Sequence, residues 1–283
     1  MRKICSMSQP QLKTTLVNYL KEKYGSISVA EVGECVLAQG NIPIALVAHM
    51  DTVFKVLPSE VYFDPKAQVM WSPQGLGADD RAGIYAIIQI IEKGYRPHII
   101  LTSDEEKGGI GASKLVKECN KHPFGKLKYL IELDRRGVQD SVFYDCDNKQ
   151  FESYINSFGF KTDWGSFSDI SILAPEWGIA AVNLSIGYES EHSQTERLFC
   201  RATERTIRKV CLMLEDADKV SKFVYIERKH YYTWRNNRYN LDGVARCDWC
   251  ATELSDKGTN TINTAYGEMC LCDDCLKAWL EWD

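Results

Sequence analysis

Residues 95–109 read YRPHIILTSDEEKGG. The apolar run in this stretch predicts a buried strand at 97–102, and the run ends in three consecutive acids, Asp104, Glu105 and Glu106. Adjacent like charges at the end of a buried strand repel one another. A bound cation would cancel that repulsion, so the stretch predicts a metal site at the carboxyl end of a strand.

Strands alternate with helical segments on both sides of this stretch. Helices are expected at about 10–25, 81–93 and 196–214, and further strands at about 27–38, 42–48, 127–134 and 179–186. Such alternation is typical of the α/β class. We therefore predict a three-layer αβα sandwich with a mostly parallel mixed sheet.

The composition limits the class of protein. The 283 residues carry a net charge of −5, which suits one large domain plus a small one and argues against a basic, nucleic-acid-binding surface. No apolar run approaches the length of a membrane span. The N-terminal residues MRKICSMSQPQLK lack the apolar core of a signal peptide, so a cytoplasmic protein is expected.

Two changes in composition predict the domain boundaries. Residues 1–217 have the size of a catalytic domain, residues 218–242 form an aromatic and basic connector, and residues 243–283 are acidic and rich in cysteine. The acidic character of the last segment disfavours nucleic acid as its partner.

Metal-binding residue types recur at the ends of the other predicted strands. Collected along the chain, they are His49, Asp51, Asp79, Asp80, Glu132, Asp134 and His192. Two imidazoles and several carboxylates that meet at one edge of a sheet are typical ligands of divalent metals such as zinc, cobalt or manganese.

The order of these motifs resembles the co-catalytic dizinc exopeptidases, which include the peptidase T, carboxypeptidase G and bacterial leucyl aminopeptidase types. The resemblance covers about residues 43–200 and rests on HMDTV, GADDRAG, SDEEKGGIGA, an acid at the end of the next strand, and a late HSxxE. It implies a hydrolase of peptide bonds with two metal ions. No gap between the motifs has room for a further domain, so a minimal catalytic core without a lid domain is expected.

The resemblance implies a role for each residue at the first metal. His49 and Asp134 would bind it, with Glu132 as the alternative to Asp134, and Asp51 would orient the imidazole. Asp80, rather than Asp79, is expected to bridge both ions.

Glu106 and His192 would complete the second metal, and Glu105 would be the general base. Two further residues are candidates for substrate binding. Asp169 follows Ser168 in a loop that is similar to one in some relatives, and Arg135 could pair with a substrate carboxylate.

The C-terminal segment contains two cysteine pairs, CDWC at 247–250 and CDDC at 272–275. Four thiolates at this spacing predict one structural zinc ion bound by Cys247, Cys250, Cys272 and Cys275, in a zinc ribbon or treble clef. Cys270 is the alternative to Cys272.

Three functions are compatible with these patterns. The first is an exopeptidase acting on small peptides, and the second is a deacylase of N-acyl amino acids, which breaks the same kind of bond. The third is a non-catalytic scaffold or binding protein. The chemically competent residue at each motif position argues against this third function. The sequence does not define an oligomeric state.

Overall fold

The computed structural model describes residues 1–228, 247, 254, 260–264 and 267–280. The chain divides into two compact units, Met1–Arg228 and Lys229–Asp283, called here the N-terminal and the C-terminal unit. Within the described residues, no helix is both long enough and apolar enough to span a membrane.

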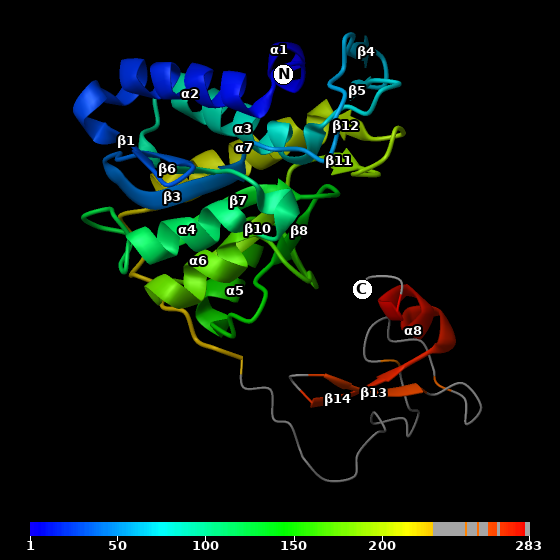
Figure 1. Ribbon diagram of the computed structural model, residues 1–283. Coiled ribbons are helices and arrows are strands. Elements are labelled where there is room, and N and C mark those ends of the chain that lie inside the picture. The colour runs from blue at the N-terminus through cyan, green and yellow to red at the C-terminus, as the bar shows by residue number, and fades with distance from the viewer. Residues whose placement is uncertain (229–246, 248–253, 255–259, 265–266, 281–283) are drawn as a thin grey trace. The chain divides into compact units, whose positions relative to one another are not determined.

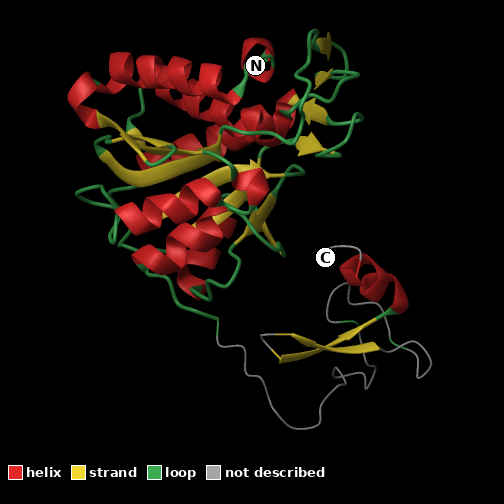
Figure 2. Ribbon diagram, viewed as in Figure 1, coloured by secondary structure: helices red, strands yellow, loops and turns green. Residues whose placement is uncertain are grey.

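An eight-stranded mixed sheet forms the middle layer of the N-terminal unit (Figure 2). Its spatial order is β1 (Val29–Val32), β2 (Cys35–Ala38), β6 (Pro97–Thr102), β3 (Ile42–His49), β7 (Tyr129–Arg135), β10 (Ala181–Ser185), β8 (Asp140–Val142) and β9 (Lys161–Asp163). The four central strands, β6, β3, β7 and β10, are parallel to one another. The predicted α/β sandwich with a mostly parallel centre is therefore confirmed.

Helices cover both faces of this sheet (Figure 1). One face packs against α2 (Gln9–Tyr24), α3 (Ala78–Glu92) and α7 (Cys200–Glu215), and the other against α4 (Ile110–Glu118) and α6 (Asp169–Trp177). The side chains of β7 alternate between the two cores, with Tyr129 and Ile131 in one and Leu130 in the other. This alternation is the period-two geometry of a strand buried on both faces.

The N-terminal unit has several further elements. They are the helices α1 (Arg2–Cys5) and α5 (Lys149–Ser157), the 3-10 turns η1 (Ser26–Ser28) and η2 (Glu105–Lys107), and a second sheet of β11 (Tyr188–Glu189), β12 (Arg197–Phe199), β5 (Val69–Trp71) and β4 (Tyr62–Asp64). The helix expected from about residue 196 begins at Cys200, because residues 197–199 pair with β5 instead.

In the C-terminal unit, β13 (Asn260–Thr264) and β14 (Gly267–Leu271) form an antiparallel hairpin. The helix α8 (Asp273–Leu280) follows directly.

Candidate metal centre

The first group of potential metal ligands lies where β3 and β7 end. His49 is the last residue of β3, and its Nε2 lies 3.1 Å from Asp79 Oδ1 and 3.5 Å from Asp134 Oδ1. The three ligand atoms all lie within 4.8 Å of one another. Parallel neighbouring strands bring these residues together because their carboxyl ends share one edge of the sheet.

A second group shares Asp79 with the first. His192 Nε2 lies 3.2 Å from Asp79 Oδ2 and 3.0 Å from Glu106 Oε2. Asp79 therefore directs one carboxylate oxygen to each imidazole. Such an arrangement has the form of a carboxylate between two adjacent cation positions.

Asp80 lies elsewhere, which differs from the expectation that it would hold the bridging position. It is fully buried, and its carboxylate accepts hydrogen bonds from the backbone N–H groups of Gly83, at 2.9 Å, and His49, at 3.3 Å. The backbone at Asp79 (φ −81°, ψ 108°) and Asp80 (φ −109°, ψ 40°) departs from helical values. The two adjacent side chains consequently diverge, Asp79 toward the imidazoles and Asp80 toward the backbone.

Asp51 links the first imidazole to the acidic turn η2. Its Oδ1 lies 3.3 Å from His49 Nδ1, and its two oxygens accept the backbone N–H groups of Glu105 and Glu106 at 3.1 Å each. Burial alone would raise the pKa of Asp51, but these hydrogen bonds outweigh burial and lower it. Asp51 thus lies between the ring of His49 and the turn η2.

Glu105 belongs to neither ligand group but lies beside both. Its Oε2 is 3.9 Å from His49 Nε2. Burial raises the pKa of Glu105 to about 9, and the charges of Asp134 and Asp169 act in the same direction while His49 opposes them.

The acids strongly favour positive charge at both imidazoles. Hydrogen bonds to Asp79 and Glu106 raise the pKa of His192 to about 10. Burial opposes protonation of His49, yet the carboxylates of Asp134, Asp51 and Asp79 hold its pKa well above the ordinary value. The site therefore carries an excess of negative charge that a cation would balance.

Two residues that the sequence analysis did not single out support the ligands. Glu196, fully buried, accepts the N–H groups of Gly77 at 2.5 Å and Asp79 at 3.1 Å, so it fixes the loop that carries Asp79. The Tyr188 hydroxyl donates to the Asp134 backbone carbonyl at 2.9 Å and lies 3.2 Å from Asp134 Oδ1. Glu196 is the last residue of the HSxxE motif, and this motif was the sequence signal that could have identified it. No motif in the sequence pointed to Tyr188.

The remaining acidic candidates have structural partners. Glu132, the alternative to Asp134, is buried and hydrogen-bonded to the Ser168 hydroxyl. Asp169 is fully buried and accepts a hydrogen bond from the Thr102 hydroxyl, and burial raises its pKa to about 6. Asp169 is not among the residues that line the pocket described next.

A pocket of about 200 Å³ opens beside the two ligand groups. Arg135 lines it, but its guanidinium is bound to Asp163 Oδ2 at 2.7 Å and to the Trp164 carbonyl at 3.1 Å. The pocket is further lined by Asp79, Glu105, Glu106, Asp134, Arg136, Tyr144, Ser166, Phe167, Asn183, Tyr188, Glu191 and His192.

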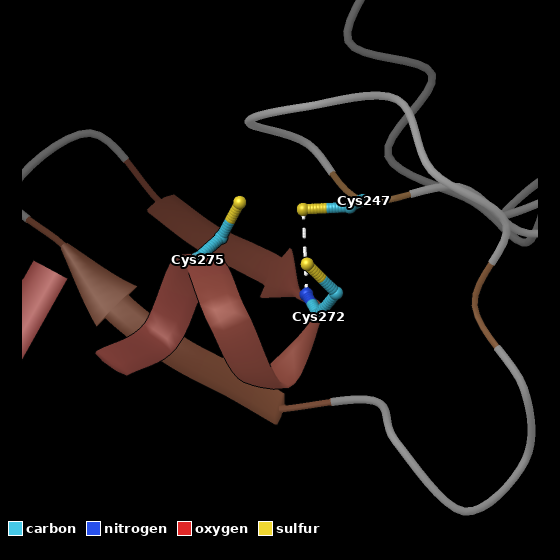
Figure 3. A group of neighbouring side chains, drawn as sticks. All are labelled: Cys247, Cys272 and Cys275. Carbon is cyan, nitrogen blue, oxygen red and sulfur yellow. Dashed lines mark hydrogen bonds between the residues drawn. The ribbon is translucent and has the colours of Figure 1, made fainter. Parts of the chain in front are cut away.

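In the C-terminal unit, Cys247, Cys272 and Cys275 form a third group of potential ligands (Figure 3). Cys250 lies outside the described residues. Cys270 is not in this group; its sulfur lies 3.8 Å from the hydroxyl of Thr261, its cross-strand neighbour.

No family model matches the chain, and no curated protein matches it by sequence. Solved structures do match. A tripeptidase from Staphylococcus aureus is 15% identical with a TM-score of 0.59, over 76% of this chain and 95% of that one. The aminopeptidase PepT from Bacillus cereus (15%, 0.57, 77% and 96%) and a TET aminopeptidase from a marine sediment Thaumarchaeota archaeon (15%, 0.55, 77% and 97%) are similarly close. At this identity, the similarity establishes the fold of the N-terminal unit.

Proposed function

We propose that the protein is a metal-dependent hydrolase that cleaves the peptide bonds of small peptides, as an exopeptidase with two divalent ions. The observation that carries this proposal is the position of Asp79, whose two oxygens face the Nε2 atoms of His49 and His192 at 3.1 and 3.2 Å. His49 and Asp134 would hold one ion with Asp79, and Glu106 and His192 the other.

The donor atoms suit zinc, cobalt or manganese. Each group combines one imidazole nitrogen with carboxylate oxygens, a set that borderline divalent metals accept. His49 turns its Nε2 to the group and its Nδ1 to Asp51. A histidine that binds a metal through one nitrogen characteristically has a carboxylate beside its other nitrogen.

Glu105 is the proposed general base. When bound, two divalent ions would lower the pKa of a water molecule and polarise the carbonyl that it attacks. The charge of the two ions would also favour the ionised form of Glu105. Its carboxylate would take the proton from that water and pass it to the leaving amine, so that water is added across the C–N bond. Its position beside the ligands, with its N–H held by Asp51, suits this transfer.

Peptides are proposed as substrates because the structural neighbours are named as a tripeptidase and aminopeptidases. The pocket of about 200 Å³ fits a small peptide better than a protein chain. We place the activity in the cytosol as part of the same proposal, since a reducing compartment keeps the many cysteines as thiols.

The test is turnover and metal content of the wild type, Glu105→Gln and Asp104→Asn, assayed on dipeptides, tripeptides and N-acyl amino acids. Glu105→Gln should lower turnover by about 10²–10⁴-fold without loss of metal, because it removes a base and not a ligand. Asp104 lies outside both ligand groups and pairs with Lys107, so Asp104→Asn is the matched control and should keep its activity.

Turnover of N-acyl amino acids alone would replace the peptidase by a deacylase. Absence of turnover in wild-type protein that holds both ions would overturn the proposal.

A further inference from the structure

Three cysteine thiols meet in the C-terminal unit, although the chain brings them from distant positions. Cys247 precedes the β13–β14 hairpin, and Cys272 and Cys275 lie after it (Figure 3). Their sulfur atoms all lie within 4.8 Å of one another. Three sulfurs at such separations fit the coordination shell of one ion, whereas a disulfide uses only two.

The surroundings of these sulfurs favour thiolates. The backbone N–H of Cys272 donates to Cys247 Sγ at 3.3 Å, a hydrogen bond that stabilises the charged form of the acceptor. Cys272 directly precedes α8, and Cys275 lies in its first turn. The N-terminus of a helix favours negative charge.

The C-terminal unit is also small. Among the residues of this unit whose burial the structure describes (247, 254, 260, 261, 270–277 and 280), Cys247 and Leu271 are buried. A unit as small as residues 229–283 commonly needs a metal or disulfides to fold.

We infer that the C-terminal unit binds a structural zinc ion through the thiolates of Cys247, Cys272 and Cys275, separately from the proposed catalytic ions. Cys250, which the sequence predicts as the fourth ligand, lies outside the described residues. An ion bound to the three thiolates would hold the hairpin and α8 to Cys247. Each thiol gives up its proton when the metal binds.

Cobalt distinguishes this site from the carboxylate and imidazole centre, because only thiolate ligands give intense sulfur-to-cobalt charge-transfer bands in the near ultraviolet. Metal-free full-length protein should develop these bands when it is titrated with Co²⁺, and their final intensity should correspond to one thiolate-bound ion per chain. Zn²⁺ added afterwards should remove them. Wild-type protein that never develops the bands would overturn the inference, and this test does not depend on any variant folding.

Variants then assign the ligands. Cys275→Ser and Cys247→Ser should each weaken the charge-transfer bands and lower the zinc content by one ion per chain. Cys270→Ser is the matched control, because Cys270 belongs to the same unit but lies outside the group, and it should keep both. Equal loss in Cys270→Ser would contradict the assignment.

Asp79→Asn separates this inference from the proposed function. It should leave the charge-transfer bands unchanged, whatever happens to peptide turnover.

Discussion

At the scale of the residue, the most informative side chain is Asp79. It is the member common to both ligand groups, while its neighbour Asp80 accepts only backbone hydrogen bonds. Asp79 and Asp80 are adjacent in the sequence but have different surroundings. Replacing each of them with Asn should therefore affect different properties of the protein.

Asp79→Asn should abolish metal binding at one or both positions, since it removes the charge shared by the two groups. The loss of metal affinity should exceed the roughly 10- to 100-fold loss that follows mutation of a residue hydrogen-bonded to a metal ligand. Asp80→Asn should keep the metals but lose about 1–3 kcal/mol of stability, because its amide NH₂ would face a buried N–H donor. Elemental analysis and urea unfolding measure the two effects. The reverse pattern would return the bridging role to Asp80.

Most candidate ligands could be predicted because acids and histidines follow the apolar strands in the sequence. His49, Asp134, Glu106 and His192 meet in space as the order of their motifs implies. The sequence could not show which of Asp79 and Asp80 faces the two imidazoles. The answer depends on the backbone angles of these two residues, which depart from helical values in the first turn of α3. The HSxxE motif marked the position of Glu196 but not its role, which is to accept backbone N–H groups.

At the scale of the element, the site depends on how closely α3 approaches β7. A Cβ atom on Gly83 would lie 2.4 Å from the Leu133 carbonyl and 2.5 Å from Asp80 Oδ1. The glycine therefore allows the helix to lie against the strand that carries Asp134, and it explains the last position of the GADDRAG motif.

Gly83→Ala should destabilise the protein by about 1–3 kcal/mol, since the helix must move away from the strand. The same movement should weaken metal binding. Gly125→Ala is the control, because its Cβ would meet no atom within 4 Å. Urea unfolding of metal-free protein measures the stability. Equal midpoints for the two variants would show that the close approach of α3 is not required.

A histidine on β6 makes the fold sensitive to pH. His98 Nδ1 accepts the Gly40 N–H at 3.1 Å, so its proton lies on Nε2, which donates to the Lys126 carbonyl at 2.8 Å. Burial lowers the pKa of His98 below its ordinary value of 6.5. The unfolded chain then binds a proton more readily than the folded one, so this group costs stability as the pH falls below 6.5.

We expect the free energy of unfolding of the wild type to fall relative to that of His98→Asn between about pH 7.5 and 5.5. Asn can still accept the Gly40 N–H but does not titrate. The comparison uses metal-free protein and urea unfolding, and the slopes of the two proteins are subtracted so that other titrating groups cancel. Parallel slopes would mean that His98 does not contribute.

At the scale of the whole molecule, the main layers were predictable, whereas the pairing of the second, four-stranded sheet was not. The buried strands and amphipathic helices of the sandwich leave periodic patterns in the sequence. The second sheet joins β4 and β5, near residues 62–71, to β11 and β12, near residues 188–199. Its strands have only two or three residues, too short for a pattern, and their pairing is fixed by tertiary contacts.

The eleven cysteines are distributed over both units, so their reactivity can test both. Cys5 and Cys35 are buried in the N-terminal unit, and burial raises the pKa of each thiol to about 12. Since the thiolate is the reactive form, both should resist alkylation at about pH 8 in the native protein. Cys272 and Cys275 are partly exposed, but a bound zinc ion would protect them.

Native protein treated with an alkylating reagent and mapped by mass spectrometry should therefore show two responses to a chelator. Cys5 and Cys35 should stay unmodified with and without it, because their protection comes from packing. Cys272 and Cys275 should become modified only after the metal is removed, because theirs comes from coordination. Protein unfolded in urea with chelator should react at every cysteine, which is the control. Modification of Cys272 and Cys275 at full rate before chelation would mean that no bound metal protects them. Modification of Cys35 in the folded protein would show that the sheet opens at β2.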